Sequence, residues 1–370
     1  MKSKHYYIQK GMITMKVRKL LCTLLASLFI TVPVLSGCND SGPKKPMFPT
    51  ISDTQTPSNP VTDTSPDVSS IVIESTPSEI STVTSIPSDS TITPAAWKVE
   101  DRDGHIIYMM GSIHMGDSSA LAMPDYIENA YKACDSLAVE ADISNVMNDP
   151  AQAQQYISLF MYEDGSTIKD HISEEVYNGA VDKLTAAGLY NAAYNQFKPF
   201  LWTSLLSMTM GNTIGLSTNS GVDMIFLDRA KHDGKTILEV ENLTYQFELF
   251  NSFSDALNNL MMAEYLQPNF ETYVNEATLD LYNQWKNGTV SEDLLLSGTF
   301  NNLDPENAAL YQEYIDKLLI TRNRSMTDTA EQYLQNGQKV FFLVGVLHFY
   351  GENGIVSLLQ KDGYTVTSLH

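Results

Sequence analysis

Cysteine and positive charge are both scarce in this chain of 370 residues. It has three cysteines, and 23 Lys and Arg residues stand against 44 Asp and Glu, which gives a formal net charge of −21 at pH 7. We expect no nucleic-acid partner, because phosphates are bound chiefly by Lys and Arg. Cys22 lies in an N-terminal apolar run, and Cys38 lies three residues beyond the end of this run. Only Cys134 then remains for the rest of the chain, which excludes an internal disulfide there.

Several familiar catalytic motifs are missing as well. The sequence has no phosphate-binding loop, no Gly-x-Ser-x-Gly elbow, no His-Glu-x-x-His helix and no dinucleotide-binding fingerprint. We therefore do not expect this chain to belong to an enzyme class that depends on one of these motifs.

The N-terminus has the order of segments found in a secretory signal. Basic residues at 16–19 precede an apolar run at 20–35, and Leu35-Ser-Gly-Cys38 follows. The run has about 16 residues, fewer than the roughly 20 that a membrane span needs. We predict a signal peptide at 1–37, cleavage before Cys38 and lipid attached to Cys38. The protein would then be extracytoplasmic and held to the cell membrane by that lipid. An uncleaved anchor helix is the alternative.

A polar tether follows, and then a globular domain. Residues 38–95 are rich in Ser, Thr and Pro, with Phe48 as their one aromatic residue. Such a composition buries too little apolar surface to offset the entropy of ordering, so we expect a disordered tether rather than a small β-domain. From 97 to 370 the composition is that of a folded domain.

The domain has β-type segments at both ends and helical patterns in its middle. We expect strands at 105–110, 136–140, 236–240, 340–345 and 364–368. We expect helices at 124–135, 147–161, 173–187, 196–211, 221–232, 243–265, 269–286 and 305–336. This order predicts an α/β fold with a mixed sheet and a largely helical insertion.

One pattern occurs twice. The apolar segment 105–110 leads into Gly111-Ser-Ile-His114, and the segment 339–344 leads into Gly345-Val-Leu-His348. Each is followed by a probable helix and then by another strand. The sheet is therefore predicted to come from two β-α-β halves, each with one Gly-x-x-His motif.

The two histidines are the leading candidates for chemistry. Ligands of open α/β sheets bind beyond the carboxyl ends of the strands, where His114 and His348 would lie. Glu140 and Glu241 follow two other apolar strands. Imidazole and carboxylate together suit a divalent cation. We predict that both histidines and one of these glutamates bind the ion, and that the other glutamate is the general base.

Each of these residues also has a plainer interpretation. A histidine can simply hydrogen-bond to the backbone at a strand end, and a glutamate there can be solvated. Glu239 competes with Glu241 for the same role. Arg322, in an expected helix, could stabilise a charged intermediate or anchor a substrate carboxylate, or it could form a surface salt bridge.

The domain resembles the TraB/GumN family, also called TraB/PrgY/GumN, which is related to the Tiki metalloproteases. The segments that carry the resemblance are 97–100, 108–116, 137–142, 221–231, 234–238 with Glu241 and Gln246, Arg322-Asn323, 342–348 with Gly351, and Gly363-Tyr364. The chain departs from the family pattern in two places: Val240 replaces the usual leucine before Glu241, and Ser112 replaces the usual threonine in the first motif.

The resemblance implicates His114, Glu140, Glu241, Arg322 and His348. It implies either a metal-dependent peptidase or related hydrolase that uses a divalent ion of unspecified identity, or a lipoprotein that binds peptides without cutting them, as in pheromone sequestration. A peptide or protein is the expected partner in both cases. The sequence leaves the oligomeric state open.

Overall fold

The computed structural model describes residues 92–142, 150–211, 213–291 and 305–370. The predicted signal peptide, Cys38 and nearly all of the predicted tether lie outside these residues. Among the helices that are described, none is both long and apolar enough to span a bilayer.

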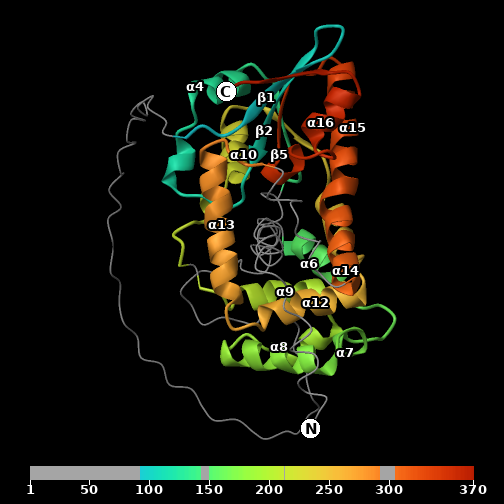
Figure 1. Ribbon diagram of the computed structural model, residues 1–370. Helices are drawn as coiled ribbons and strands as arrows, with labels where there is room; N and C mark the ends of the chain where they lie inside the picture. Colours follow the sequence, from blue (N-terminus) through green and yellow to red (C-terminus); the bar gives the residue numbers. More distant parts are fainter. Residues whose placement is uncertain (1–91, 143–149, 212, 292–304) are drawn as a thin grey trace, which may run out of the picture. The chain divides into compact units, whose positions relative to one another are not determined.

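A six-stranded mixed sheet forms one part of the structure (Figure 1). Its strands are β1 (Ala96–Glu100), β2 (Ile106–Ser112), β3 (Ser136–Val139), β4 (Thr236–Glu239), β5 (Val340–Gly345) and β6 (Thr365–Ser368). Their order across the sheet is β4-β3-β5-β2-β1-β6. β1 is antiparallel to both of its neighbours, whereas the pairs β2–β5, β5–β3 and β3–β4 are parallel.

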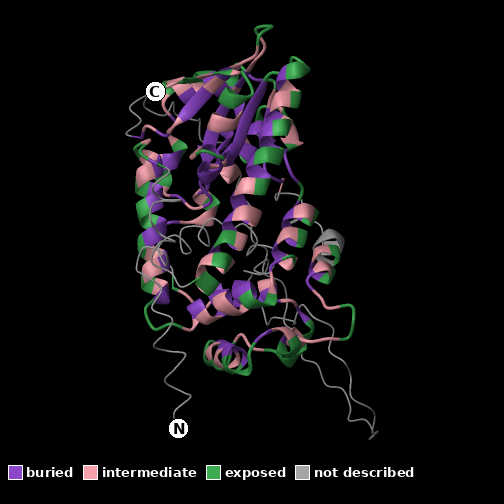
Figure 2. Ribbon diagram, turned by 45° about the vertical axis from the view of Figure 1, so that its right-hand side comes forward, coloured by how far each residue is buried: buried purple, intermediate pink, exposed green. Residues whose placement is uncertain are grey.

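Helices cover both faces of this sheet because residues of the central strands are apolar on both sides. On one face Phe342 packs in a core with Met326 of α15 (Thr321–Gln335) and Leu359 of α16 (Ile355–Lys361). On the other face Phe341 contacts the rings of Tyr131 and Phe226, which belong to α4 (Asp125–Lys132) and α10 (Val222–His232). The central strands β2, β3 and β5 are largely buried as a result (Figure 2), whereas the edge strands β4 and β6 are partly exposed.

The predicted fold class is confirmed. β2-α4-β3 and β5-α16-β6 are two strand–helix–strand units of one sheet, and each contains a Gly-x-x-His motif after its first strand. β2 and β5 are direct parallel neighbours, with Gly111 opposite Val344. The two motifs therefore emerge side by side at one edge of the sheet.

The segment between the two units is mostly helical, as expected. Its described helices are α6 (Pro150–Leu159), α7 (Ile168–His171), α8 (Glu174–Ala186), α9 (Pro199–Ser207), α10, α11 (Leu243–Asn251), α12 (Asp255–Tyr265), α13 (Phe270–Lys286), α14 (Pro305–Ile315) and α15. α14 and α15 are continuous through one π-helical stretch, Asp316–Ile320. A π-helical stretch within a longer helix is frequently found at a functional site, and Arg322 follows this one by two residues.

Two predicted helices differ from the structure, and one strand was not predicted. The helix predicted at 243–265 is two helices, because the Ser254 side chain accepts the Leu257 N–H and starts α12 anew. The helix predicted at 196–211 is shorter and begins at Pro199, after a 3₁₀ turn at Ala192–Gln196. The strand β1 was not predicted, although the side chains of Trp97 and Val99 alternate into the core as a strand requires.

Candidate functional site

The two Gly-x-x-His loops meet beyond the carboxyl ends of β2 and β5. Ser112 lies opposite Gly345 at the last position of this strand pair. His114 and His348 follow within three residues, and their side chains are only 8% and 4% exposed. Neither histidine is therefore an exposed surface residue.

The close approach of the loops depends on Gly111. A Cβ atom at this position would lie 2.7 Å from the backbone Cα of Val346, in the second loop. The Gly111 carbonyl also accepts a 2.8 Å hydrogen bond from the indole of Trp285 in α13. The first motif therefore needs its glycine because the second loop packs directly on it.

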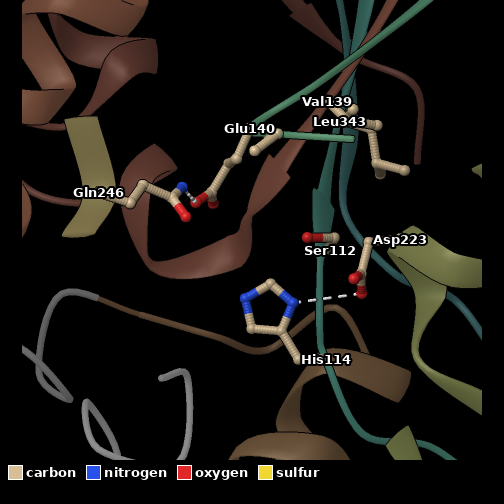
Figure 3. A pocket seen from close by; sticks show the side chains of 8 residues that line it. Ser112, His114, Val139, Glu140, Asp223, Gln246 and Leu343 are labelled. Carbon is tan, nitrogen blue, oxygen red and sulfur yellow. Dashed lines mark hydrogen bonds and ion pairs between the residues drawn. The ribbon is translucent and has the colours of Figure 1, made fainter. Parts of the chain in front are cut away.

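The His114 loop is fixed to the start of α10. The Val222 N–H donates to the Ile113 carbonyl at 2.8 Å, which places Asp223, the next residue of the helix, beside the imidazole. Nδ1 of His114 lies 3.2 Å from Oδ1 of Asp223, at the distance of an ion pair, although the two atoms are not aligned as a hydrogen bond (Figure 3). Burial disfavours the imidazolium, but Asp223 and then Glu140 outweigh it, so the pKa of His114 is raised.

His348 contacts α15. Its Nδ1 lies 2.6 Å from Oδ1 of Asn323, and its Nε2 lies 3.7 Å from Oε1 of Glu140. Burial, reinforced by the charge of Arg322, lowers the pKa of His348 to about 3. The ring is therefore neutral at physiological pH, which is the form that binds metal ions.

Two buried glutamates lie where β3 and β4 end. The Glu241 N–H donates to the Glu140 carbonyl at 2.9 Å, so the two residues continue the pairing of the strands. Both residues are 8% exposed. Oε1 of Glu140 accepts a 2.7 Å hydrogen bond from the N–H of Gly345, the glycine of the second motif.

Arg322 joins the two carboxylates. Its Nη2 lies 2.6 Å from Oε2 of Glu140 and 2.8 Å from Oε2 of Glu241, and its Nε lies 2.9 Å from Oε1 of Glu241. Its Nη1 donates to the Leu318 carbonyl one turn earlier. Burial works against the guanidinium charge, but the two glutamates outweigh it and raise the pKa of Arg322. Burial also disfavours the Glu140 carboxylate, but Arg322 outweighs it and the pKa of Glu140 is about 2.

Gln246 of α11 completes the network. Its Nε2 lies 3.3 Å from Oε2 of Glu140 and 3.2 Å from Oε2 of Glu241. Glu239 faces elsewhere: it is exposed, and its Oε1 accepts the Asp142 N–H. Of the two glutamates that competed in the sequence, Glu241 is the one that belongs to this cluster.

A pocket opens onto this cluster (Figure 3). It encloses about 290 Å³, open solvent included, and is lined by Ser112, His114, Val139, Glu140, Ala141, Asp223, Gln246 and Leu343. The structure thus brings His114, Glu140, Glu241, Arg322 and His348 to one edge of the sheet. Asp223 was not among the predicted site residues, although it lies in the segment 221–231 that carries the family resemblance.

The cluster has the composition of a divalent-metal site. Glu140 and Glu241 share the single guanidinium of Arg322, and the neighbouring His348 ring is neutral, so one negative charge of this pair of carboxylates is left without a cation. Buried charge of this kind is costly unless a cation is bound. The candidate ligand atoms of His114, His348 and Glu140 do not all lie within 4.8 Å of one another. Among the described residues, the three that meet this criterion are Asp101, Asp103 and His105, in the partly exposed β1–β2 turn. Side-chain rotation would be needed for His114, His348 and Glu140 to share one ion.

Comparison with known proteins agrees with this picture of the domain. Uncharacterized protein YbaP of Escherichia coli (strain K12) is 24% identical over 255 residues, which are 68% of this chain and 87% of that protein. Metalloprotease TIKI homolog of Amphimedon queenslandica is 28% identical over 207 residues, which are 51% of this chain and 40% of that protein. No solved structure matches the chain.

The sequence profile of one family covers nearly the whole domain. The match to the TraB/PrgY/gumN family extends over residues 95–368, from the start of β1 to the end of β6. It includes both Gly-x-x-His motifs, both buried glutamates and Arg322. The chain belongs to the TraB/PrgY/gumN family.

Proposed function

We propose that this protein is a lipid-anchored, metal-dependent peptidase in which His114, His348 and Glu140 hold a divalent ion. The observation that carries the proposal is the convergence of these three side chains at one sheet edge, beside a pocket. Two imidazoles and one carboxylate are a common ligand set of catalytic zinc. The similarity to a protein named as a metalloprotease homologue supports the same activity.

Glu140 is the better of the two candidate carboxylate ligands. Its Oε1 lies toward His348 and accepts one backbone hydrogen bond. Both oxygens of Glu241 instead contact Arg322. Glu241 is then the second carboxylate, which holds Arg322 in place and is the candidate general base.

The other residues would prepare the site for a peptide. A divalent ion held there would supply the Lewis acid that polarises a scissile carbonyl and lowers the pKa of water. Arg322 pairs with both glutamates and holds them in place beside the pocket. Burial of the histidines limits access of bulk water to the reacting groups.

The cellular setting is part of the proposal. Cleavage before Cys38 and lipid on that cysteine would place the domain outside the cytoplasm, at the end of a tether. A peptide or protein in that compartment is the proposed substrate. The order of the basic, apolar and small-residue segments at the N-terminus supports this assignment.

Peptide binding without cleavage is the second candidate. The observation in its favour is that Arg322 already neutralises part of the carboxylate charge and contacts both glutamates. Such a network could be a structural ion cluster beneath a peptide-binding pocket.

Metal content measured beside peptide cleavage separates the two functions. The purified full chain should contain a stoichiometric divalent ion and should cleave members of a mixed peptide library, and His348→Ala should lose both properties. His232→Ala is the control, because His232 is exposed at the C-terminal end of α10 and lies outside the cluster. If the wild-type chain holds no metal and cuts no peptide but retains peptides, and His348→Ala retains them equally, the binding function is correct.

A further inference from the structure

The environment of His348 specifies which of its ring nitrogens carries the proton. Asn323 is 3% exposed and lies on α15 directly after Arg322. Its Nδ2 donates a 2.8 Å hydrogen bond to the backbone carbonyl of Asn353. A carbonyl oxygen can only accept, so the NH₂ end of the Asn323 amide must face Asn353.

The opposite end of the amide then faces His348. Oδ1 of Asn323 has no hydrogen to donate, and it lies 2.6 Å from Nδ1 of the imidazole. At this distance Nδ1 must carry a hydrogen, because two lone pairs would otherwise face one another in a buried place. In a neutral ring the hydrogen on Nδ1 leaves Nε2 as a bare lone pair.

That lone pair lies on the side of the ring nearer to Glu140. Nε2 is 3.7 Å from Oε1 of Glu140, too far for a hydrogen bond. Oε1 of Glu140 already accepts a hydrogen bond from the Gly345 N–H, so it has a partner without a proton on Nε2 of His348. The free nitrogen and the carboxylate oxygen are thus presented to the same space.

The other motif has the same arrangement. Nδ1 of His114 is also the nitrogen that lies beside a polar side chain of a flanking helix, in this case Asp223 of α10. Asp223 and Asn323 lie on different helices, so the two contacts arose from different parts of the chain. The two histidines thus share a contact through Nδ1, although the partner residues lie outside the repeated segments.

We infer that Asn323 is a positioning residue for His348. The Asn353 carbonyl fixes the orientation of the Asn323 amide, and the amide oxygen in turn holds His348 as its Nδ1–H tautomer. In this tautomer Nε2 is free to bind a metal ion. Partners of this kind set the tautomer and orientation of metal-binding histidines, and their loss lowers metal affinity by about 10- to 100-fold. The inference deepens the proposed function, but the tautomer itself can be measured without metal.

The test uses the metal-free full chain with ¹⁵N-labelled histidine. Long-range ¹H–¹⁵N correlation spectra should show a proton on Nδ1 of His348, assigned by its disappearance in His348→Gln. Asn323→Ala should shift the ring toward the Nε2–H tautomer and should weaken binding of added Zn²⁺ by about 10- to 100-fold. Asn323→Asp keeps an acceptor for Nδ1–H and should preserve the wild-type protonation of that nitrogen.

Asn258→Ala is the matched control. Asn258 is also buried, at 6% exposure, and its Nδ2 also donates to a backbone carbonyl, that of Phe253. This variant should lose stability without any change in the His348 signals. An Nε2–H tautomer in the wild-type protein, or an unchanged Nδ1–H tautomer in Asn323→Ala, would overturn the inference. The expected tautomers together with no Zn²⁺ binding by the wild-type protein would instead refute the proposed function and leave the role of Asn323 intact.

Discussion

Arg322 and Glu140 form a buried ion pair, with Nη2 2.6 Å from Oε2, at the point where β3 ends. The pair joins α15 to the sheet across 182 positions of the chain. Each side chain is only 9% exposed, so removing one partner leaves the other charge buried. The site and the stability of the domain are therefore coupled through this contact.

Replacing Arg322 should destabilise the domain strongly. In Arg322→Met two glutamates lose their cation, and breaking a buried ion pair in this way costs about 3–5 kcal/mol. Urea denaturation with a chelator present measures the loss. Arg324→Met is the control on the same helix: its side chain is 49% exposed and pairs with Asp328 and Asp362, so the loss should stay within about 1 kcal/mol. Equal losses in the two variants would contradict the structural role of Arg322.

The three glutamates near the end of the sheet should differ in their effect on metal binding. Glu140→Gln removes a proposed ligand and should have the largest effect. Glu241→Gln removes no proposed ligand but weakens the contact that holds Arg322 beside Glu140, and it should lower affinity by about 10- to 100-fold. Glu239→Gln is the control, because that side chain is exposed and outside the cluster. Calorimetric titration with Zn²⁺ gives the order, and a larger effect of Glu241→Gln would assign the ligand to Glu241 instead.

Alanine substitutions at the glycines of the two motifs should have different effects on stability and on metal binding. An alanine at Gly111 would place its Cβ 2.7 Å from the Val346 backbone, which cannot move alone, so Gly111→Ala should cost about 1–3 kcal/mol of stability or more. At Gly345 the nearest atom is Oε1 of Glu140, 3.0 Å away, at the end of a side chain. Gly345→Ala should therefore cost less stability and should weaken metal binding. Thermal unfolding and Zn²⁺ titration of both variants test the contrast, which similar melting temperatures would refute.

His348 should make the metal-free protein sensitive to acid. Its folded-state pKa is about 3 against an ordinary value of 6.5, so below pH 6.5 the unfolded chain binds a proton that the folded protein does not. Stability should fall as the pH drops from about 6.5 toward 3, by about 2 kcal/mol between pH 7 and pH 5. His348→Gln lacks this contribution, so its unfolding free energy should change less over the same interval. Identical pH profiles for the two proteins would show that His348 is not buried as a neutral ring.

Lipid attachment should depend on Cys38 alone. The Leu35-Ser-Gly-Cys38 motif predicts that the mature protein begins at Cys38 and partitions with membranes. Cys38→Ala should remove the lipid and release the protein from the membrane fraction. Fractionation with N-terminal mass spectrometry checks this. A Cys38→Ala protein that stays in the membrane with an intact N-terminus would establish the uncleaved anchor helix.

Much of the fold could be predicted from local patterns. Apolar strands that end in glycine indicated β2 and β5, and their repeated Gly-x-x-His motifs predicted that they lie in one sheet. β1 was missed because only five residues carry its alternation, directly after the polar segment that precedes it. The break between α11 and α12 was missed because apolar residues continue from one helix into the next. The local feature that separates them is the N-cap formed by the Ser254 side chain.

The candidate site was predictable in part. His114, His348, Glu140 and Glu241 each follow an apolar strand, and parallel strands place such residues at one edge. Arg322 gave no local sign of burial, because its helix carries polar residues on either side of it. The contact partner of His114 was also hidden, since Asp223 comes close only when α10 begins beside the Ile113 carbonyl.

The sequence by itself determined the residue types at the strand ends, the α/β class and the repeat of the two motifs. These follow from local propensity and from the two-residue period of a strand, which act over a few positions. Only the tertiary structure decided that Arg322 bridges Glu140 and Glu241, that Glu239 points elsewhere, and that Asn323 and Asp223 each lie beside Nδ1 of one histidine. Such contacts join helices to strands that are tens to hundreds of positions apart. They form because the buried polar groups must find partners once the sheet and its helices have packed.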